Sequence, residues 1–474
     1  MSKKKVAQII VEVLENAGVK RCYGVVGDTL NDVTDAMHHH SQIEWVHVRH
    51  EEVGGFAAGA ESFMTKELSA CAGSCGPGSL HFINGLFESH RNGAPVVLIA
   101  SQLPTNVLGT NFPQEVDYIP IYQSCSVFCE LITNPHEAKR IVMSACQAAL
   151  TEKGVAVVIL PSDISATVVE DLPVLQQYQP KQPLIRPIDD EIIKMANLLN
   201  AGERVGIYAG AGCEGSHEEL IALCEKLKAP IAHTSRGKDF VEANNPYNVG
   251  MTGMMGIKSG YEMIEHCDTL LILGADFAWS QFYPKHAKII QVDIDVKKLG
   301  LRHAIELGVI GHIKETLQAL LPHLTQKTSS EFLDKYVDLY HKTTAKLDKK
   351  AVADHENLIH PQYLTELLDQ YADDDALATA DGGSATVWLL RHFKTNGKRR
   401  TLISLKHGTM ANAMPQSIGL QKAYPNRQVI SLSGDGGLTM LMGDLLTIVQ
   451  EKLPIKIIII NNGALDFGIG RAHV

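Results

Sequence analysis

The sequence predicts an α/β protein built from three doubly wound parallel-sheet domains, the last of them incomplete. Short apolar runs alternate with helical patterns along the whole chain. The runs are rich in β-branched residues, lack polar alternation and end mostly in Gly, Asp, Asn or Ser. Such runs are typical of parallel strands that are buried on both faces of a sheet.

The apolar runs define the expected strands. They lie at residues 45–48, 95–99, 155–160, 205–208, 269–273, 288–292, 428–432 and 455–460. Near the amino terminus, apolar residues between Val6 and Ala17 repeat at helical spacing and predict an amphipathic helix. The histidines at 38–40 are expected to lie in a solvated loop rather than at a metal site.

Two polar stretches suggest where the domains meet. Four prolines interspersed with glutamines lie between residues 173 and 187, and proline prevents both helix continuation and donation to a β-ladder. A second stretch, from Gln326 to Lys350, is lysine-rich and partly helical in pattern. We therefore expect domains at 1–180, 181–335 and 336–474.

Composition and charge exclude several classes of protein. Of 474 residues 45% are apolar, and 43 Lys and Arg against 53 Asp and Glu give a net charge of −10 with no charged block. A nucleic-acid partner is not expected, because it requires a basic surface. The nine cysteines fit a reducing compartment. Glu12 and Glu15 exclude a signal peptide, and no apolar run approaches the ~18 residues of a membrane span, so we expect a cytoplasmic protein.

The third block carries two motifs that together predict a metal and phosphate site. Gly434-Asp435-Gly436 follows one expected strand, and Asn461-Asn462 follows the next strand. In a parallel sheet both motifs lie at the carboxyl ends of strands, where open α/β folds bind ligands. Asp435, Asn462 and the backbone carbonyl of Ala464 offer the hard oxygen ligands that magnesium prefers. The glycines allow a phosphate to approach the backbone.

This pair of motifs resembles the signature of thiamine-diphosphate-dependent enzymes. The resemblance covers residues 1 to about 468 and is closest to the pyruvate oxidase family, which includes quinone-dependent pyruvate dehydrogenases. Arg49 to Val53, Cys71 to Gly78 and His407 to Pro415 carry it. The resemblance implies a first domain that binds the pyrimidine ring, a central FAD domain and a third domain that binds the diphosphate and Mg²⁺.

The resemblance also implies the residues of the thiamine diphosphate site. Those lining the cofactor are Asp381, Gly382, Gly383, Ser384, His407, Gly408, Thr409, Gly434, Gly436 and Gly437, with Met410 under its bend, and those holding magnesium are Asp435, Asn462 and Ala464. Glu51, Gln114 and Phe467 are implied to be catalytic. Gln114 follows Pro113, where the family usually has phenylalanine.

Glu51 fits the chemistry that thiamine catalysis requires. The cofactor removes its own reactive proton once a carboxyl group hydrogen-bonds its aminopyrimidine ring, so the protein must supply one buried carboxyl group. Glu51 begins an expected helix, and the small residues Gly54, Gly55, Ala57 and Ala58 that follow allow close approach. Without the family match, Glu51 would be an ordinary first-turn acid of a helix.

The middle block carries a weaker signal for a dinucleotide. Gly210-Ala211-Gly212 follows a strand, but the third glycine of the usual fingerprint is displaced. Asp293 closes another strand, as a ribose-binding acid would. By resemblance, the residues that contact FAD are Thr252, Gly253, Met254, Met255, Ala275, Asp276, Phe277, Ala278, Trp279 and Asp293. A scaffold without flavin is the alternative for this domain.

The resemblance implies oxidative decarboxylation of pyruvate to acetate and CO2, with electrons passed through FAD to ubiquinone. Residues 105–115 contain no histidine, whereas simple keto-acid decarboxylases carry paired histidines in this region. Residues 109–135 contain no lysine, whereas acetolactate synthases usually carry one there. The alternatives are an acetolactate synthase-type carboligase and a catalytically silent, cofactor-binding fragment.

The resemblance further implies assembly. The cofactor is expected between the first domain of one subunit and the third domain of another, so we expect a homo-oligomer, at least a dimer and by resemblance a tetramer. Residues 469–474 match nothing expected of the family, which predicts a truncated chain. Contact with the inner face of the cell membrane is expected only through a missing carboxy-terminal segment of the full-length protein.

Overall fold

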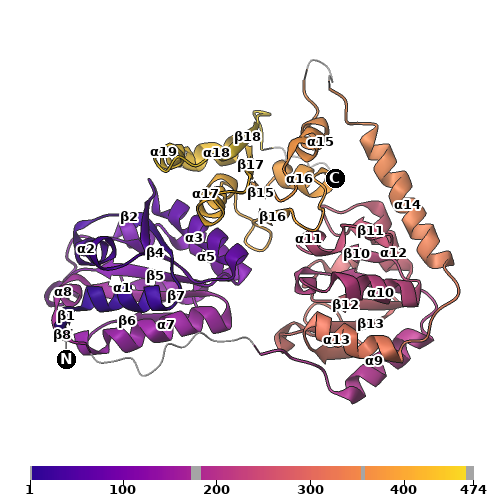
Figure 1. Cartoon of the computed structure of the whole chain (residues 1–474), viewed down its shortest axis with the longest axis horizontal. Helices are drawn as coiled ribbons and strands as arrows, with labels where there is room; N and C mark the ends of the chain where they lie inside the picture. Colours follow the sequence, from indigo (N-terminus) through magenta and orange to yellow (C-terminus); the bar gives the residue numbers. More distant parts are fainter. Residues whose placement is uncertain (1–2, 172–182, 354–357, 466–474) are drawn as a thin grey trace. The chain divides into compact units, whose positions relative to one another are not determined.

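The computed structural model describes residues 3–171, 183–353 and 358–465, and it divides into two compact units (Figure 1). The first unit comprises residues 1–182, 377–386 and 402–474. The second comprises residues 183–376 and 387–401. The third sequence block therefore contributes to both units.

A six-stranded parallel sheet forms one part of the first unit. Its order is β3-β2-β4-β5-β7-β6, from strands β2 (Arg21–Val25), β3 (Glu44–His47), β4 (Ser69–Gly73), β5 (Val96–Gln102), β6 (Phe128–Leu131) and β7 (Val155–Pro161). A short antiparallel ribbon pairs β1 (Lys3–Lys5) with β8 (Val168–Glu170).

Helices cover both faces of this sheet. Helices α1 (Val6–Asn16), α2 (Asn31–His40) and α7 (Ala138–Glu152) pack in one core, and α3 (Glu51–Thr65) and α5 (Ile83–Asn92) pack in another. Val97 and Ile99 of β5 belong to the first core, and Val96 and Leu98 belong to the second. Because successive side chains of a strand point to opposite faces, the sheet is doubly wound.

A second sheet of the chain has the order β16-β15-β17-β18. Its elements are β15 (Leu377–Ala380), α16 (Ser384–His392), β16 (Arg400–Ile403), α17 (Ala413–Ala423), β17 (Val429–Gly434), α18 (Asp435–Leu441), α19 (Leu445–Gln450) and β18 (Lys456–Ile460). Strand β17 pairs in parallel with β15 and β18. Helix α17 packs against α3, where a Cβ on Gly419 would lie 2.0 Å from the carbonyl oxygen of Ala57. Glycine is therefore required at 419.

The second unit contains a six-stranded parallel sheet of order β11-β10-β9-β12-β13-β14. Its strands are β9 (Val205–Ala209), β10 (Ile231–His233), β11 (Asn248–Met251), β12 (Thr269–Leu273), β13 (Lys288–Asp293) and β14 (Leu307–Ile310). Helices α9 (Asp189–Ala201), α10 (His217–Leu227) and α13 (Ile313–Leu320) lie in one core, and α12 (Lys258–His266) and α14 (Glu331–Asp348) lie in the other. Helix α11 (Lys238–Val241) follows β10, and α15 (Pro361–Tyr371) follows α14.

These elements confirm the α/β class, the expected strands and the first helix. One expectation is wrong: the histidines at 38–40 form the exposed last turn of α2 instead of a loop. Val33, Ala36 and Met37 are buried at helical spacing, so packing of one face extends the helix through the polar histidines. Most of the polar stretch 326–350 is helix α14. Across the described ranges, we find no helix with the length and apolar character needed to cross a bilayer.

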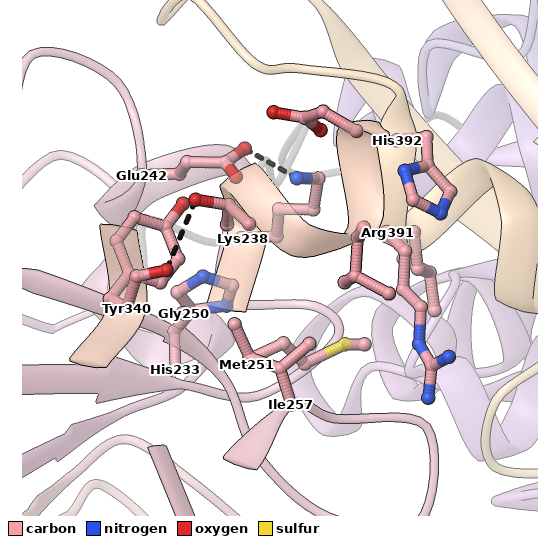
Figure 2. A pocket seen from close by; sticks show the side chains of 13 residues that line it. His233, Lys238, Glu242, Gly250, Met251, Ile257, Tyr340, Arg391 and His392 are labelled. Carbon is pink, nitrogen blue, oxygen red and sulfur yellow. Dashed lines mark hydrogen bonds and ion pairs between the residues drawn. The ribbon is translucent and has the colours of Figure 1, made fainter. Parts of the chain in front are cut away.

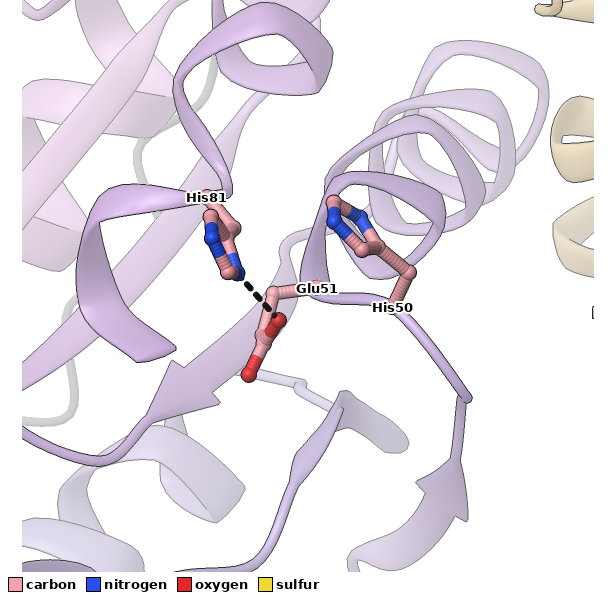
Figure 3. A group of neighbouring side chains, drawn as sticks. All are labelled: His50, Glu51 and His81. Atoms are coloured by element: carbon pink, nitrogen blue, oxygen red, sulfur yellow. Dashed lines mark hydrogen bonds and ion pairs between the residues drawn. The ribbon is translucent and has the colours of Figure 1, made fainter. Parts of the chain in front are cut away.

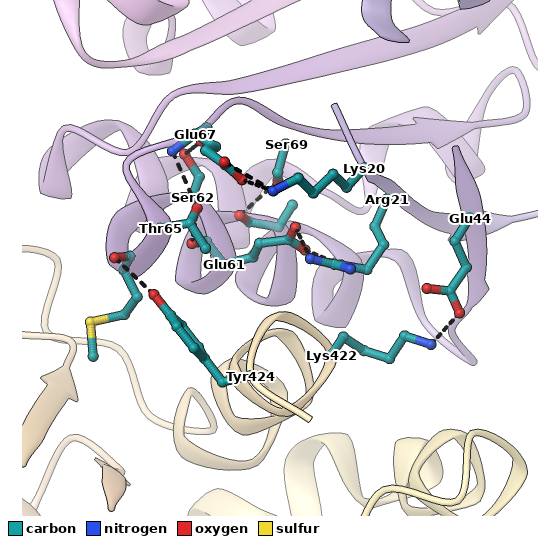
Figure 4. A network of polar contacts seen from close by, with 12 residues as sticks. Lys20, Arg21, Glu44, Glu61, Ser62, Thr65, Glu67, Ser69, Lys422 and Tyr424 are labelled. Carbon is teal, nitrogen blue, oxygen red and sulfur yellow. Dashed lines mark hydrogen bonds and ion pairs between the residues drawn. The ribbon is translucent and has the colours of Figure 1, made fainter. Parts of the chain in front are cut away.

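A buried ion pair ties strand β2 to helix α3 (Figure 4). The Arg21 guanidinium donates to the two carboxylate oxygens of Glu61 at 2.7 and 2.9 Å. The Tyr23 hydroxyl donates to the same carboxylate at 2.6 Å. The Glu61 side chain is 4% exposed, whereas the neighbouring Lys20–Glu67 pair lies largely in solvent. The two pairs therefore differ chiefly in burial.

Glu61→Gln should lower the free energy of unfolding by about 3–5 kcal/mol, because it leaves the Arg21 charge buried without its partner. Glu67→Gln should lower it by less than about 1 kcal/mol, since exposed ion pairs contribute little. Urea unfolding of the two variants and the parent measures the difference. Equal shifts of the unfolding midpoint in the two variants would contradict this account.

Candidate active site

Glu51 is the first residue of helix α3 (Figure 3). His50 caps this helix, since its Nδ1 accepts a hydrogen bond from the backbone N–H of Glu52 at 3.2 Å. The Glu51 side chain is 12% exposed, and its Oε2 lies 3.0 Å from Nδ1 of His81. His81 directly follows the short helix α4 (Pro77–Leu80). The structure thus holds a nearly buried carboxyl group at a helix N-terminus through one imidazole.

His50, Glu51 and His81 could be taken for a metal site. Among the residues that the structure describes, they form the one group of three or more His, Cys, Asp or Glu side chains with ligand atoms within 4.8 Å of one another. Their two imidazole rings are stacked, with centroids 4.7 Å apart and planes 21° apart. A histidine nitrogen binds zinc at about 2.0–2.1 Å. Its lone pair lies in the ring plane, so two nearly parallel rings cannot converge on one ion.

The segment Gly76-Pro77-Gly78 flanks Glu51. A Cβ on Gly78 would lie 3.5 Å from Oε1 of Glu51. Gln114 is exposed, has a φ of +70° and accepts a hydrogen bond from Sγ of Cys75 at 3.4 Å. The structure therefore brings Gln114 to the loop that flanks Glu51.

Asn84 on helix α5 contacts both helix α3, which begins with Glu51, and the loop that contains Met410. Its Nδ2 donates to Oε1 of Glu52 at 2.7 Å and to Oγ1 of Thr409 at 3.2 Å. Its Oδ1 lies 2.7 Å from Nε2 of His407, whose ring stacks on Phe87 with centroids 5.6 Å apart. Helix α5 therefore positions the loop that contains Met410.

A second side chain of α5 supports the same loop. Glu88 is buried and accepts a hydrogen bond from the Ser404 hydroxyl at 2.6 Å. The Ser404 oxygen accepts hydrogen bonds from the backbone N–H groups of Gly408 and Thr409 at 3.0 and 3.1 Å. The path of residues 404–409 is thus determined by a buried carboxylate that lies over 300 positions earlier in the chain.

Asp435 and the loop that contains Asn462 meet at the carboxyl ends of β17 and β18. Oδ2 of Asp435 accepts a hydrogen bond from the backbone N–H of Gly463 at 3.0 Å. Oδ1 of Asn462 accepts one from the backbone N–H of Ala464 at 3.1 Å. A carboxylate, an amide oxygen and a backbone carbonyl are ligands that suit Mg²⁺, which takes its other ligands from phosphate and water. These residues fit a hard divalent cation.

Asp381 directly follows strand β15. Its carboxylate accepts hydrogen bonds from the backbone N–H groups of Ala413 at 2.9 Å and Gly434 at 3.2 Å. A Cβ on Gly437 would lie 2.3 Å from Oδ2 of Asp381, so glycine is required there. Burial raises the pKa of Asp381 to about 6, although the backbone N–H groups oppose the rise.

Three of the predicted cofactor glycines face open space. A Cβ added to Gly383, Gly408 or Gly434 would meet no atom within 4 Å. Gly382 is instead packed against the carbonyl oxygen of Thr409, and Ser384 begins α16. Open space beside glycine backbone is what a phosphate group needs in order to approach the main chain. The residues present therefore fit a diphosphate. A Cβ on Gly436 would lie 3.6 Å from Cε of Met410.

In the second unit, the segments predicted to contact FAD follow the carboxyl ends of neighbouring or nearby strands. Residues 252–255 follow β11, residues 275–279 follow β12, and Asp293 ends β13. Thr252 is 4% exposed, and its hydroxyl has no hydrogen-bond partner within the described ranges. A Cβ on Gly253 would lie 3.4 Å from Phe277. A buried hydroxyl without a partner at this edge fits a site that a polar ligand completes.

The glycine turn at 210–212 has a packing explanation. A Cβ on Gly210 would lie 2.3 Å from the carbonyl oxygen of Gly274, and one on Gly212 would lie 2.7 Å from the Gly274 Cα. Close packing of two loops therefore accounts for these glycines without a ligand.

A separate cavity of about 50 Å³, lined by both polar and apolar side chains, lies in the second unit (Figure 2). Lys238 and Glu242 form an ion pair at its wall, and Arg391 donates to two backbone carbonyl groups. His233 also lines the cavity, and burial lowers its pKa to about 4. A cavity of this volume holds a few water molecules, so it is too small for a flavin.

Sequence comparisons agree with this arrangement. Models of the thiamine pyrophosphate enzymes match the chain three times: the N-terminal TPP binding domain at residues 4–121, the central domain at 192–320 and the C-terminal TPP binding domain at 381–469. The matches together span more than half of the chain. The chain belongs to the thiamine pyrophosphate enzymes.

Relatives of this thiamine pyrophosphate enzyme match nearly its whole length. YdaP of Bacillus subtilis, whose name proposes that it contains thiamine pyrophosphate, is 31% identical over 463 residues, which is 98% of this chain and 80% of YdaP. Pyruvate oxidase of Lactiplantibacillus plantarum is 29% identical over 470 residues, with 97% and 77% covered. The large subunit of acetolactate synthase isozyme 1 of Escherichia coli is 28% identical over 469 residues, with 97% and 82% covered.

The structure adds residues to the site that sequence analysis missed. Asn84 and Ser404 contact the loop of this thiamine pyrophosphate enzyme that contains Met410, and His81 contacts Glu51. Polar residues at 84 and 88, spaced i and i+4 on a helix, were a usable signal, because they lie on one face. Phe467, predicted to be catalytic, lies outside the described residues.

In the cofactor-free enzyme, Asp381 should make stability fall as pH rises from about 4 to about 6. Its pKa is about 6 in the folded chain against an ordinary 3.8. Over this range the folded state binds more protons than the unfolded state. The free energy of unfolding therefore decreases as the pH rises. Asp381→Asn cannot ionise and should lack this loss. Thermal unfolding midpoints of parent and variant across this range check it, and a constant difference between them would refute it.

Proposed function

We propose that this thiamine pyrophosphate enzyme oxidatively decarboxylates pyruvate to acetate and CO2, and passes the electrons through FAD to ubiquinone. The observation that carries the proposal is the nearly buried Glu51 carboxyl group, held by His81 at the N-terminus of α3. Thiamine diphosphate, the compound also called thiamine pyrophosphate, supplies the reactive carbon when it is bound, and its activation requires a carboxyl group beside its aminopyrimidine ring.

In this proposal each part of the first unit has one task. Glu51 shares a proton with the ring nitrogen of the cofactor, and His81 orients the Glu51 carboxylate. Met410 shapes the cofactor from the loop that Asn84 and Ser404 position. Gln114 contacts the substrate, and Phe467, which lies outside the described residues, is proposed to be catalytic.

The glycine-rich edge of the third block would hold the diphosphate and its cation. Asp435, Asn462 and the carbonyl of Ala464 hold Mg²⁺. The open space beside Gly383, Gly408 and Gly434 supports this assignment, because no side chain blocks the approach of a phosphate group to the main chain there. The N–H groups of Gly408 and Gly434 already donate to Ser404 and Asp381.

FAD is proposed for the second unit. The Thr252 hydroxyl, buried and without a partner among the described residues, would donate to it, and Asp293 would accept from its ribose. The aromatic side chains of Phe277 and Trp279 lie near Gly253 and would pack against it.

An acetolactate synthase-type carboligase is the second candidate, because acetolactate synthases and pyruvate oxidase are relatives at similar identity. The two reactions share the pyruvate substrate and differ in the step after CO2 is lost. The absence of lysine from residues 109–135 favours oxidation. A cofactor-binding protein without turnover is the third candidate.

We also propose a homo-oligomer, at least a dimer, in the cytoplasm or on the inner face of the cell membrane. The resemblance places each cofactor between the first domain of one subunit and the third domain of another. Within this chain, α3 and α5 also contact residues of the third block directly. The mass of the enzyme in solution, by light scattering, tests this part of the proposal.

Pyruvate added without oxygen to the chain reconstituted with thiamine diphosphate, Mg²⁺ and FAD should bleach the visible absorbance of the bound flavin. Glu51→Gln should slow this bleaching by about 10²–10⁴-fold, the range expected for loss of a proton-transferring group. Its affinity for thiamine diphosphate should change little, because Glu51 is not among the diphosphate ligands.

Glu67→Gln on an exposed surface is the matched control and should bleach flavin like the parent. An unchanged flavin spectrum with accumulating acetolactate would replace the proposal with the carboligase. Neither bleaching nor acetolactate, in a chain that binds the cofactors, would indicate the silent protein.

Asp435→Ala should weaken thiamine diphosphate binding by well over 10-fold at fixed Mg²⁺. It removes the one charged ligand proposed for the cation, an effect larger than the roughly 1 kcal/mol of a single hydrogen bond. Asn462→Ala should weaken binding less, since an amide is the weaker ligand. Calorimetric titration checks both, with unfolding of the second unit as the control. Parent-like affinity of Asp435→Ala would overturn the magnesium assignment.

A further inference from the structure

A buried carboxylate of the third block accepts hydrogen bonds from the residues just before Glu51. Asp444 ends the 3-10 turn η9 (Met442–Asp444) and is 1% exposed. Its Oδ1 accepts from the backbone N–H of Arg49 at 2.8 Å, and its Oδ2 accepts from that of His50 at 3.1 Å. One carboxylate therefore spans two consecutive peptide groups.

The carboxylate is itself held in place. The Thr447 hydroxyl lies 2.7 Å from Oδ1 of Asp444 and 3.3 Å from the carbonyl oxygen of His47. His47 ends β3 and His50 caps α3, so Asp444 and Thr447 together contact both ends of the connection between strand and helix. This connection leads directly into Glu51.

We infer that Asp444 is a positioning residue for Glu51. Asp444 sets the direction of the first turn of α3, and this turn presents the Glu51 carboxyl group to the cofactor. The inference rests on the proposed function of Glu51. Asp444 needs no contact with cofactor or substrate for this role, because it acts through two main-chain N–H groups.

The geometry makes this role sensitive to small changes. A carboxylate accepts through both oxygens, whereas an amide presents one acceptor and one donor. In Asp444→Asn the amide nitrogen would face one of the two N–H groups, so one hydrogen bond is lost and the segment at 49–50 shifts. Misplacement of a reacting group by about 1 Å can cost about 10²-fold in rate.

The test follows exchange of the C2 proton of bound thiamine diphosphate for deuterium, by acid quench and NMR. Asp444→Asn should slow this exchange by about 10–10²-fold, with affinity for thiamine diphosphate within about 3-fold of the parent, a change of less than about 1 kcal/mol. Thr447→Val keeps both acceptor oxygens and should slow exchange less. It also tests the inference if Asp444→Asn does not fold.

Ser69→Ala is the structural control. Ser69 is buried and donates to the carbonyl of Ala58, so its loss disturbs α3 in the helix interior rather than at Glu51. Ser69→Ala should lower the unfolding midpoint without slowing proton exchange. If it slowed exchange as much as Asp444→Asn, general loosening of α3 would replace the inference.

A double-mutant cycle separates this inference from the proposed function. If Asp444 acts through Glu51, adding Asp444→Asn to Glu51→Gln should slow exchange no further. Additive effects, or parent-like exchange in Asp444→Asn, would overturn the inference and leave the role of Glu51 intact. Parent-like exchange in Glu51→Gln would instead overturn the proposed function.

Discussion

The close approach of helices α3, α5 and α17 is the constraint on which the candidate site depends. Gly419 of α17 lies against the backbone of Ala57, and Gly85 of α5 lies against the backbone of α3, at distances that leave no room for a Cβ. Larger side chains at these positions would force the helices apart. Short polar side chains such as Asn84 and Asp444 could then no longer span from one segment to the other.

Within this packing, three carboxylates differ because their surroundings differ. Asp381 and Asp444 are buried, and each accepts from two backbone N–H groups, so they organise loops. Burial raises the pKa of Asp444, and its hydrogen bonds with backbone and Thr447 oppose that rise. Glu51 instead contacts the imidazole of His81 and lies beside Gly78. Of the three, Glu51 is the carboxyl group that we propose meets the cofactor.

The second unit also has a six-stranded parallel sheet covered by helices, but its strand order differs from that of the first sheet. Its glycine turn at 210–212 is filled by neighbouring backbone, whereas the buried hydroxyl of Thr252 has no partner in the described ranges. A glycine-rich turn in this unit therefore does not by itself indicate a ligand site. The weak dinucleotide fingerprint is explained by packing, and the ligand signal comes from a residue outside it.

Local sequence determined the strands, the α/β class and the neighbourhood of Asp435 and Asn462, because β-branched runs and strand-end turns act over a few residues. The histidines at 38–40 lie in a helix instead of the predicted loop, because burial of Val33, Ala36 and Met37 outweighs the polarity of the exposed turn. Only the tertiary structure decided that Asp444 holds the backbone before Glu51 and that Glu88 holds the loop after Ser404. Such partners lie hundreds of positions apart in the chain. Local sequence patterns do not show which distant residues come into contact, because the packing of helices and sheets determines those contacts.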